Sequence, residues 1–353
     1  MPGVMKVYRR TISETGESKL GKMEKLYTHN GDGEPLVTIL FLPGTKVDNR
    51  KDYSKRIGNI AGTIKYTEFF LTGKEDGKEI HNNPRLQFLG IYYDNWHNRK
   101  FDIEGFNKKP ESYYYNESYA MSKFLAPLYA ETVQDTIVDR LPLEEAMERM
   151  GHLVVCGVSA GGVFGLEVDN AITDRMRGLG YNEDEIDKIL QRKHSLFLGN
   201  TANPRFARST NIFAMNKKDE VSRMRIPDFD ELIGNDSDYL TVSKIAKNSL
   251  IISSDISDEE LLRKTQPNKT PSTTDDHHHP DLFVYGDNVL SYMAKNILRN
   301  IVKNSLAGKT PQNPTDLLKN TSPMADNNKD TDINHVYTEA IKTALAADQI
   351  RGK

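Results

Sequence analysis

Short apolar runs alternate along the chain with longer segments in which apolar residues recur every three or four positions. The runs are rich in β-branched residues, which predicts strands buried on both faces, and the longer segments predict amphipathic helices. The expected strands are residues 36–42, 86–93, 152–157, 195–198 and 211–215. The expected helices are residues 117–150, interrupted at Leu141-Pro142, then 161–177, 184–192 and 288–302. Alternating strands and helices predict an α/β fold: a mostly parallel central sheet with helices on both faces.

Two segments depart from this alternation. Residues 4–11 and 23–29 alternate apolar and polar side chains around a turn with Gly, Ser and Glu, which predicts an antiparallel β-hairpin at a sheet edge. Residues 221–274 are polar and charged and contain proline. We expect this second segment to pass over the sheet as a lid-like insertion instead of joining it.

These segments suggest one main domain and a tail. Residues 1–306 form the expected α/β domain, with 221–274 as an insertion or cap. Residues 307–332 are rich in Asn, Pro, Thr, Asp and Lys, which predicts a flexible linker. Residues 333–353 contain a short amphipathic helix at 335–347. A chain of 353 residues is long enough for one large core or two modest ones.

Composition narrows the classes of partner. The net charge of −3, from 47 basic and 50 acidic residues, gives no overall attraction to nucleic acid. The single cysteine, Cys156, rules out a disulfide within the chain and lies in an apolar run, where we expect it to be a small buried residue. The first ten residues lack the apolar core of a secretory signal, and no stretch approaches 18 apolar residues. A soluble cytoplasmic protein is the default expectation.

One motif carries candidate chemistry. Gly157-Val158-Ser159-Ala160-Gly161 has the pattern G-x-S-x-G between an expected strand and an expected helix. A serine on such a turn adopts a strained backbone, and glycines two residues before and after it remove side chains that would collide. The N–H groups at the start of the following helix favour negative charge near the serine. The motif predicts Ser159 as a nucleophile.

A second interpretation of the motif stays open, namely a glycine-rich turn that packs closely or binds a phosphate. A Walker phosphate loop is excluded, because no Gly-Lys-Ser/Thr follows. The glycines also lack the dinucleotide-binding spacing, so we expect no cofactor.

The motif, the order of the elements and the turn Pro43-Gly44-Thr45 resemble the α/β-hydrolase superfamily, in its lipase and esterase branch, over roughly residues 36–302. In that family a catalytic triad runs Ser, Asp or Glu, then His along the chain. The resemblance implies Asp219, which follows the expected strand 211–215, as the triad acid. Glu220 and Asp228 are the alternatives.

The resemblance places the triad histidine in a later loop. His279 begins His-Pro-Asp-Leu-Phe, which is similar to the His-Ser-Asp-Tyr-Phe stretch of several lipase-like hydrolases. His277 and His278 precede it directly, and the choice among the three stays open. A metal site with Asp275 and Asp276 is the rival interpretation, but adjacent residues seldom aim their rings at one ion and no His-x-x-x-His spacing is present. We therefore expect no metal.

The resemblance also implies an oxyanion hole built from the backbone N–H groups of Ala160 and Thr45. The expected function is a serine hydrolase that cleaves a carboxylic ester through an acyl-enzyme. A lipid-like ester is preferred, with peripheral membrane contact, because aromatic residues at 92–97 and 113–115 and a lid over 221–274 would suit an acyl chain. An acyltransferase with the same triad and a catalytically silent binding protein of the same fold are the alternatives.

The tail suggests a further hypothesis about location. A Lys- and Asn-rich chain with a linker and a terminal helix at 307–353 also suits a bacterial effector that is exported into a host by a signal-independent route. This hypothesis rests on composition alone.

Overall fold

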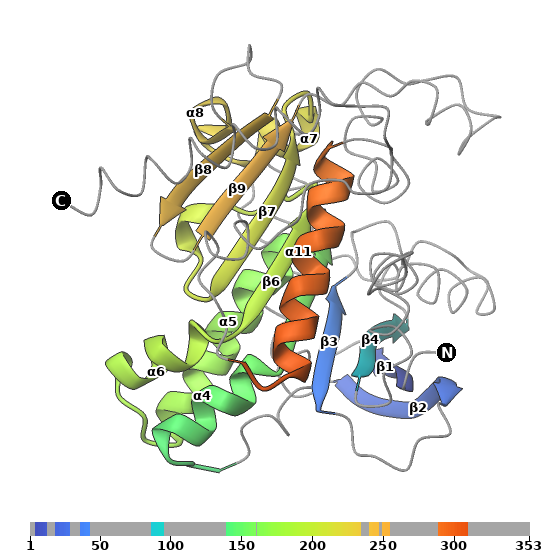
Figure 1. Cartoon of the computed structure of the whole chain (residues 1–353). Coiled ribbons are helices and arrows are strands. Elements are labelled where there is room, and N and C mark those ends of the chain that lie inside the picture. Colours follow the sequence, from blue (N-terminus) through green and yellow to red (C-terminus); the bar gives the residue numbers. More distant parts are fainter. Residues whose placement is uncertain are drawn as a thin grey trace, which may run out of the picture.

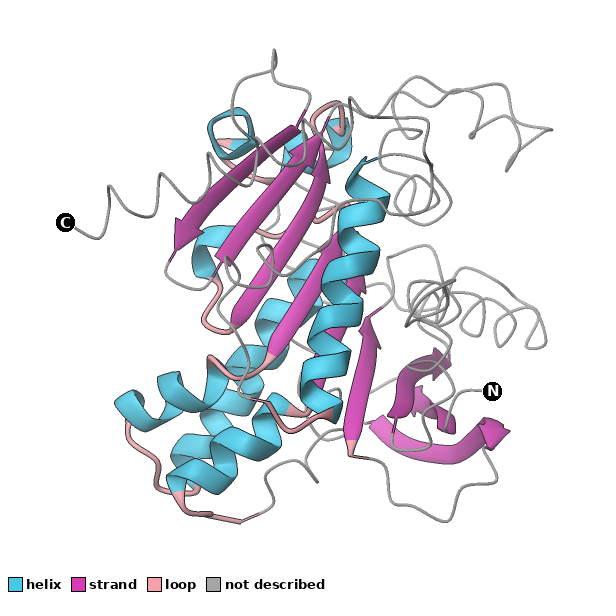
Figure 2. Cartoon of the chain, in the orientation of Figure 1, coloured by secondary structure: helices cyan, strands magenta, loops and turns pink. Residues whose placement is uncertain are grey.

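The computed structural model describes residues 4–12, 18–28, 36–42, 86–94, 139–159, 161–233, 240–246, 249–254 and 289–309. In these residues a single sheet carries helices on both faces (Figure 1). Figure 2 shows the same arrangement by secondary structure, with the strands side by side and one long helix crossing them.

Nine strands form the sheet, in the order β2-β1-β4-β3-β5-β6-β7-β9-β8. Their bounds are β1 Val4–Ile12, β2 Ser18–Thr28, β3 Val37–Leu42, β4 Leu86–Asp94, β5 Leu153–Val158, β6 His194–Leu198, β7 Thr210–Asn216, β8 Leu240–Ala246 and β9 Ser249–Ser254. Strands β3, β5, β6, β7 and β9 are parallel neighbours, and β4 and β1 continue the parallel sheet beyond β3. Strands β2 and β8 pair antiparallel with their neighbours and form the two edges.

The helices are α4 Leu143–Gly151, α5 Gly161–Gly178, α6 Glu183–Leu190, the 3-10 helix η4 Pro204–Phe206, α7 Glu220–Arg225, α8 Phe229–Ile233 and α11 Val289–Leu306. Helix α11, drawn in orange, crosses one face of the sheet, while α5 lies against the other face with α4 and α6 beside it (Figure 1). Helix α4 begins directly after Pro142, which cannot supply an N–H to a preceding turn.

Both faces of the central strands are buried. On β3, Leu40 and Leu42 pack into a core with Phe164 of α5, while Val37 and Ile39, which alternate with them, are equally buried. A strand between two helical layers buries both sets of its side chains, and each large apolar side chain so buried stabilises the fold by about 1.5–3 kcal/mol. This burial explains the continuous apolar runs in the sequence.

The strands and helices expected from the hydrophobic pattern are confirmed within a few residues wherever the structure describes them. The N-terminal hairpin is also confirmed, with β2 at the sheet edge and beginning at Ser18, earlier than the pattern predicted. Most of the expected helix 117–150, nearly all of the linker and the C-terminal helix 335–347 lie outside the described residues.

The expectation for residues 221–274 is wrong for 240–246 and 249–254, whereas the described residues 221–233 lie outside the sheet. After α7 and α8, strands β8 and β9 belong to the sheet, and β9 lies between β7 and β8. All six residues of β9 are buried. Three of its six residues are serine, so its sequence, Ser-Leu-Ile-Ile-Ser-Ser, does not have the continuous apolar pattern of a buried strand. Serine can be buried here because Ser253 Oγ donates to the backbone oxygen of Ile233 at 2.7 Å. Residues 255–274, also assigned to the cap, lie outside the described residues.

A buried ion pair joins α5 to the amino ends of β6 and β7. Lys193 Nζ lies 2.9 Å from Asp169 Oδ1, and the two side chains are 0% and 2% exposed. Lys193 Nζ also donates to Ser195 Oγ at 2.7 Å, and Ser209 Oγ donates to Asp169 Oδ2. Each charge therefore has a partner of opposite sign and a hydroxyl, which offsets its loss of hydration.

Substitution Lys193→Met should lower the free energy of unfolding by about 3–5 kcal/mol, because it leaves the Asp169 charge buried without its partner. Equilibrium urea unfolding measures the change. The double variant Lys193→Met, Asp169→Leu should regain most of the loss, since no charge then remains.

The exposed pair Arg149–Glu145 provides a matched control, with both side chains 44% exposed. Arg149→Met should cost about 0.5 kcal/mol or less, since solvent screens this pair. Equal losses for Lys193→Met and Arg149→Met would contradict a structural role of the buried pair.

Candidate functional site

Ser159 lies on the tight turn between β5 and α5. Its φ is +55°, in the left-handed region that costs a residue with a side chain about 1–3 kcal/mol. Its backbone N–H donates to the Leu198 oxygen at 3.0 Å, which extends the pairing of β5 with β6 by one residue. Its carbonyl accepts from the N–H of Gly162 at 3.0 Å. The strained turn that the motif predicts is present, and the half-buried serine is its central residue.

The flanking glycines are needed for steric reasons. A Cβ on Gly157 would lie 2.7 Å from the Phe197 ring and 2.9 Å from the Gly161 carbonyl carbon. A Cβ on Gly161 would collide with the backbone oxygen of Leu42, at the end of β3. The residues before and after Ser159 therefore lie in close contact with each other and with strands β3 and β6. This close contact is what the glycines of the G-x-S-x-G motif allow.

The first turn of α5 is packed against the loop that follows β6. A Cβ on Gly162 would collide with Oδ1 of Asn200, which is fully buried. Asn200 folds onto its own loop, because its Oδ1 accepts from the Ala202 N–H at 3.0 Å and its Nδ2 donates to the Ala202 oxygen at 2.6 Å. Asn200 could not be predicted from the sequence, because its position depends on a contact with a helix that begins 39 residues earlier.

Asp219 lies three residues after the end of β7 and is the N-cap of α7. It is 0% exposed, although it lies in a turn rich in charged residues. Its Oδ1 accepts from the Ser222 N–H at 3.0 Å, and its Oδ2 accepts from Ser222 Oγ at 2.6 Å. An Asp at the N-cap position bonds the N–H three residues later, so this contact could have been predicted once the helix start was known.

Ser159 and Asp219 both lie at the carboxyl edge of the sheet, that is, where its parallel strands end. They follow β5 and β7, which are parallel and separated by β6 alone. Two strand spacings amount to about 10 Å between backbones, a span that a serine, an imidazole and a carboxylate can fill together. The geometry is therefore compatible with a histidine bridging the two.

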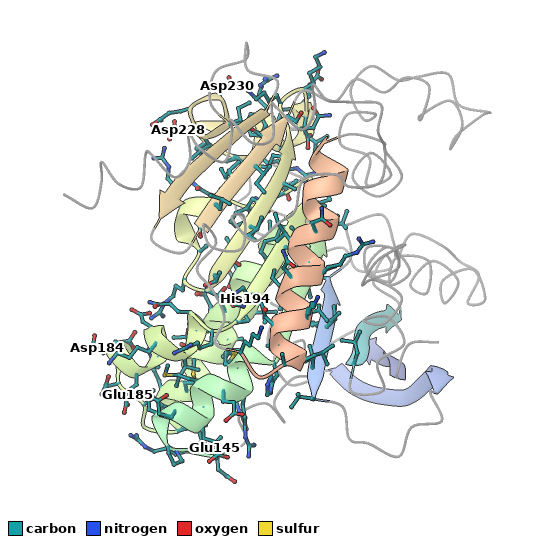
Figure 3. The ribbon with its side chains drawn as sticks, in the orientation of Figure 1. Glu145, Asp184, Glu185, His194, Asp228 and Asp230 are labelled. Carbon is teal, nitrogen blue, oxygen red and sulfur yellow. The ribbon has the colours of Figure 1, made fainter. Side chains whose placement is uncertain are left out.

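The other expected site residues are only partly described. Five of them lie outside the described residues, namely His277, His278, His279, Ala160 and Thr45. The alternative acids are both described: Glu220 is half-buried in the first turn of α7, and Asp228 is exposed in the turn before α8. Figure 3 shows Asp228 and Asp230 at the end of the sheet where α7 and α8 lie, and Glu145 and Asp184 at the opposite end. Neither alternative shares the burial of Asp219.

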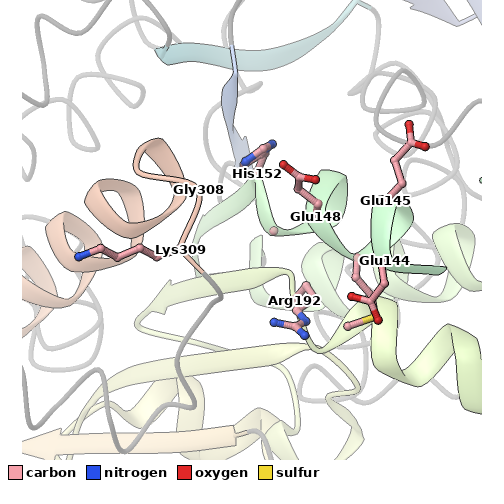
Figure 4. Close-up of a pocket in the computed structure, with 9 residues that line it drawn as sticks. Glu144, Glu145, Glu148, His152, Arg192, Gly308 and Lys309 are labelled. Carbon is pink, nitrogen blue, oxygen red and sulfur yellow. The ribbon is translucent and has the colours of Figure 1, made fainter. Parts of the chain in front are cut away.

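A hollow of about 440 Å³ lies at the amino edge of the sheet, where the parallel strands begin. Figure 4 shows Glu144 and Glu148 of α4 on one side of it and Lys309, after α11, on the other, with His152 and Arg192 between them. Acidic and basic side chains face one another there, at the amino ends of β5 and β6. This hollow is therefore separate from the edge that carries Ser159 and Asp219.

Comparison of the chain with protein-family models, with curated proteins and with solved structures finds no match to any of them. Among the helices that the structure describes, none is long and apolar enough to cross a membrane. Within the same residues no group of three or more His, Cys, Asp or Glu side chains is arranged to hold a metal ion.

The two ends of α5 offer a test of the strained turn. Gly161→Ala should destabilise the protein by about 1–3 kcal/mol or more, because the new methyl meets a backbone oxygen that cannot move aside. Gly178→Ala, in the last turn of the same helix, has no atom within 4 Å of the added Cβ and should be neutral or stabilise by up to about 1 kcal/mol. Thermal unfolding of both variants measures the contrast, and equal effects would contradict the close approach of the turn to β3.

Proposed function

We propose that the chain is a serine hydrolase that cleaves a carboxylic ester, with Ser159 as nucleophile, His279 as general base and acid, and Asp219 as the acid that orients the histidine. The observation that carries the proposal is the φ of +55° at Ser159, on a turn squeezed between glycines at the end of a buried parallel strand. A serine hydroxyl is presented in this way where it must reach a substrate.

The proposed reaction has two steps. In the first, Ser159 Oγ attacks the acyl carbon while the imidazole of His279 takes the hydroxyl proton. The leaving alcohol receives that proton, and an acyl-enzyme remains on Ser159. In the second step water attacks the acyl-enzyme and gives a proton to the same imidazole, which passes it to Ser159 Oγ as the free acid leaves.

Helix α5 supports the developing charge in this reaction. It starts at Gly161, two residues after Ser159, so its positive end faces the serine. We propose the backbone N–H of Ala160 as one oxyanion donor and that of Thr45, after β3, as the second. The position of Leu42 against Gly161 supports the second assignment, since the end of β3 reaches the nucleophile turn.

Asp219 is the best-supported acid among the three candidates. A buried carboxylate beside a histidine stabilises the imidazolium and holds its tautomer. Asp219 is buried at the edge that carries Ser159, whereas Asp228 is exposed. The order of elements also supports an α/β-hydrolase fold: Ser159 follows β5, Asp219 follows β7, and residues 277–279 come after β9.

The proposed substrate is a carboxylic ester, and no particular length of acyl chain is favoured. The preference for a lipid ester depended on a lid over 221–274, and part of that segment is strands β8 and β9 of the sheet. Of the aromatic segments 92–97 and 113–115, the other basis of that preference, only residues 92–94 are described, as the last residues of β4.

A fluorophosphonate probe tests the proposal directly. The wild-type protein should form a covalent adduct on Ser159, read by intact mass and peptide mapping, and Ser159→Ala should form none. His279→Ala should abolish labelling on the same time scale, and Asp219→Asn should slow it by roughly 10⁴-fold, the size of effect seen when a triad acid can no longer fix its histidine.

Glu220→Gln and Asp228→Asn are the matched controls, since each removes a nearby carboxylate and should leave the labelling rate unchanged within about 2-fold. A folded wild-type protein without an adduct would overturn the proposal and favour a catalytically silent binding protein. Loss of labelling in Asp228→Asn but not in Asp219→Asn would reassign the acid.

A further inference from the structure

Ser222 contacts the carboxylate of Asp219 at both oxygens. Its backbone N–H donates to Oδ1 at 3.0 Å, and its hydroxyl lies 2.6 Å from Oδ2. Asp219 and Ser222 are both fully buried. Any helix with an Asp N-cap makes the first contact, but the second requires a serine or threonine at this position. The carboxylate is thus held from two sides by one residue.

The same hydroxyl reaches a third group. Ser222 Oγ lies 2.7 Å from the backbone oxygen of Asn200, in the loop after β6. A hydroxyl has one proton and can accept with its remaining lone pairs, so the carboxylate and the carbonyl share that one proton. Ser222 therefore ties the end of β7 to the end of β6 through two short contacts.

Asn200 in turn lies against the nucleophile turn, because its side chain contacts the Gly162 position in the first turn of α5. A continuous set of buried contacts therefore runs from α5, which begins beside Ser159, through Asn200 and Ser222 to Asp219. We infer that Ser222 is a positioning residue that fixes the Asp219 carboxylate relative to Ser159. This inference rests on the proposed function and adds a residue that the triad alone does not require.

Three substitutions of Ser222 separate this role from simple packing. Ser222→Thr keeps the hydroxyl and adds a methyl group, and Ser222→Val adds the same bulk without the hydroxyl. Ser222→Ala removes the hydroxyl without added bulk. All three keep the backbone N–H contact with Asp219, so only the hydroxyl contact differs between Thr and Val.

The measurement is the rate of fluorophosphonate labelling of Ser159 as a function of probe concentration, resolved into probe affinity and maximal rate. Ser222→Ala and Ser222→Val should lower the maximal rate by about 10- to 100-fold, the loss that corresponds to one hydrogen bond to a charged group. Probe affinity should change little, and Ser222→Thr should restore most of the rate. The Tm of Ser222→Val should fall further than that of Ser222→Thr, because Val also leaves two buried acceptors without their donor.

Ser305→Ala is the control for the loss of a buried serine hydroxyl away from the site, since Ser305 Oγ donates to the Gly151 oxygen at 3.0 Å. It should leave the labelling rate unchanged. If the β-branched variants do not fold, the comparison of Ser222→Ala with Ser305→Ala decides alone. Labelling of Ser222→Ala at the wild-type rate would overturn the inference and leave the proposed function intact, whereas an unlabelled wild-type protein would overturn both.

Discussion

The arrangement at the carboxyl edge of the sheet depends on the close approach of the Ser159 turn to its neighbouring strands. The turn holds a serine at a φ of +55°, which costs about 1–3 kcal/mol. That cost is offset by the parallel sheet around it, since the Ser159 N–H continues the hydrogen bonds of β5 to β6 and Gly161 lies against the end of β3. Strands β3, β5 and β6 therefore stabilise the conformation of Ser159 together.

The parallel sheet also explains why buried polar groups gather in two places. Parallel strands end at the same edge, so the loops after β6 and β7 meet, and Asn200, Asp219 and Ser222 satisfy one another there. At the opposite edge, Lys193 and Asp169 do the same between the amino ends of the strands and α5. The apolar layers lie between these two edges. A polar network at each end of a sheet buried on both faces fixes the strands relative to the helices without interrupting the core.

The hydrophobic pattern was sufficient to predict the α/β class and the strong strands, because burial on both faces leaves a continuous apolar run that needs no tertiary information. It failed at β9, where three of six residues are serine and one, Ser253, depends on the backbone oxygen of Ile233. The strained turn was predictable, because the G-x-S-x-G spacing is visible in the sequence, although the contact of Gly161 with Leu42 of β3 appears only in the fold. The burial of Asp219 and the contacts of Asn200 with α5 were not, because each depends on how loops from different strands meet.

A close-packed turn without a reactive serine is the simplest rival to the proposed function, and the structure weighs against it in one respect. Close packing accounts for Gly157, Gly161 and Gly165, whose added Cβ atoms would all collide with neighbours. It does not account for Ser159, because a left-handed position that serves packing alone is most stable with glycine, or with asparagine or aspartate. Phosphate binding by α5 also has fewer donors than its glycines suggest, since the Gly162 N–H is directed at the Ser159 carbonyl. A serine kept at an energetic disadvantage, on the edge that also buries a carboxylate, favours a chemical role for its hydroxyl.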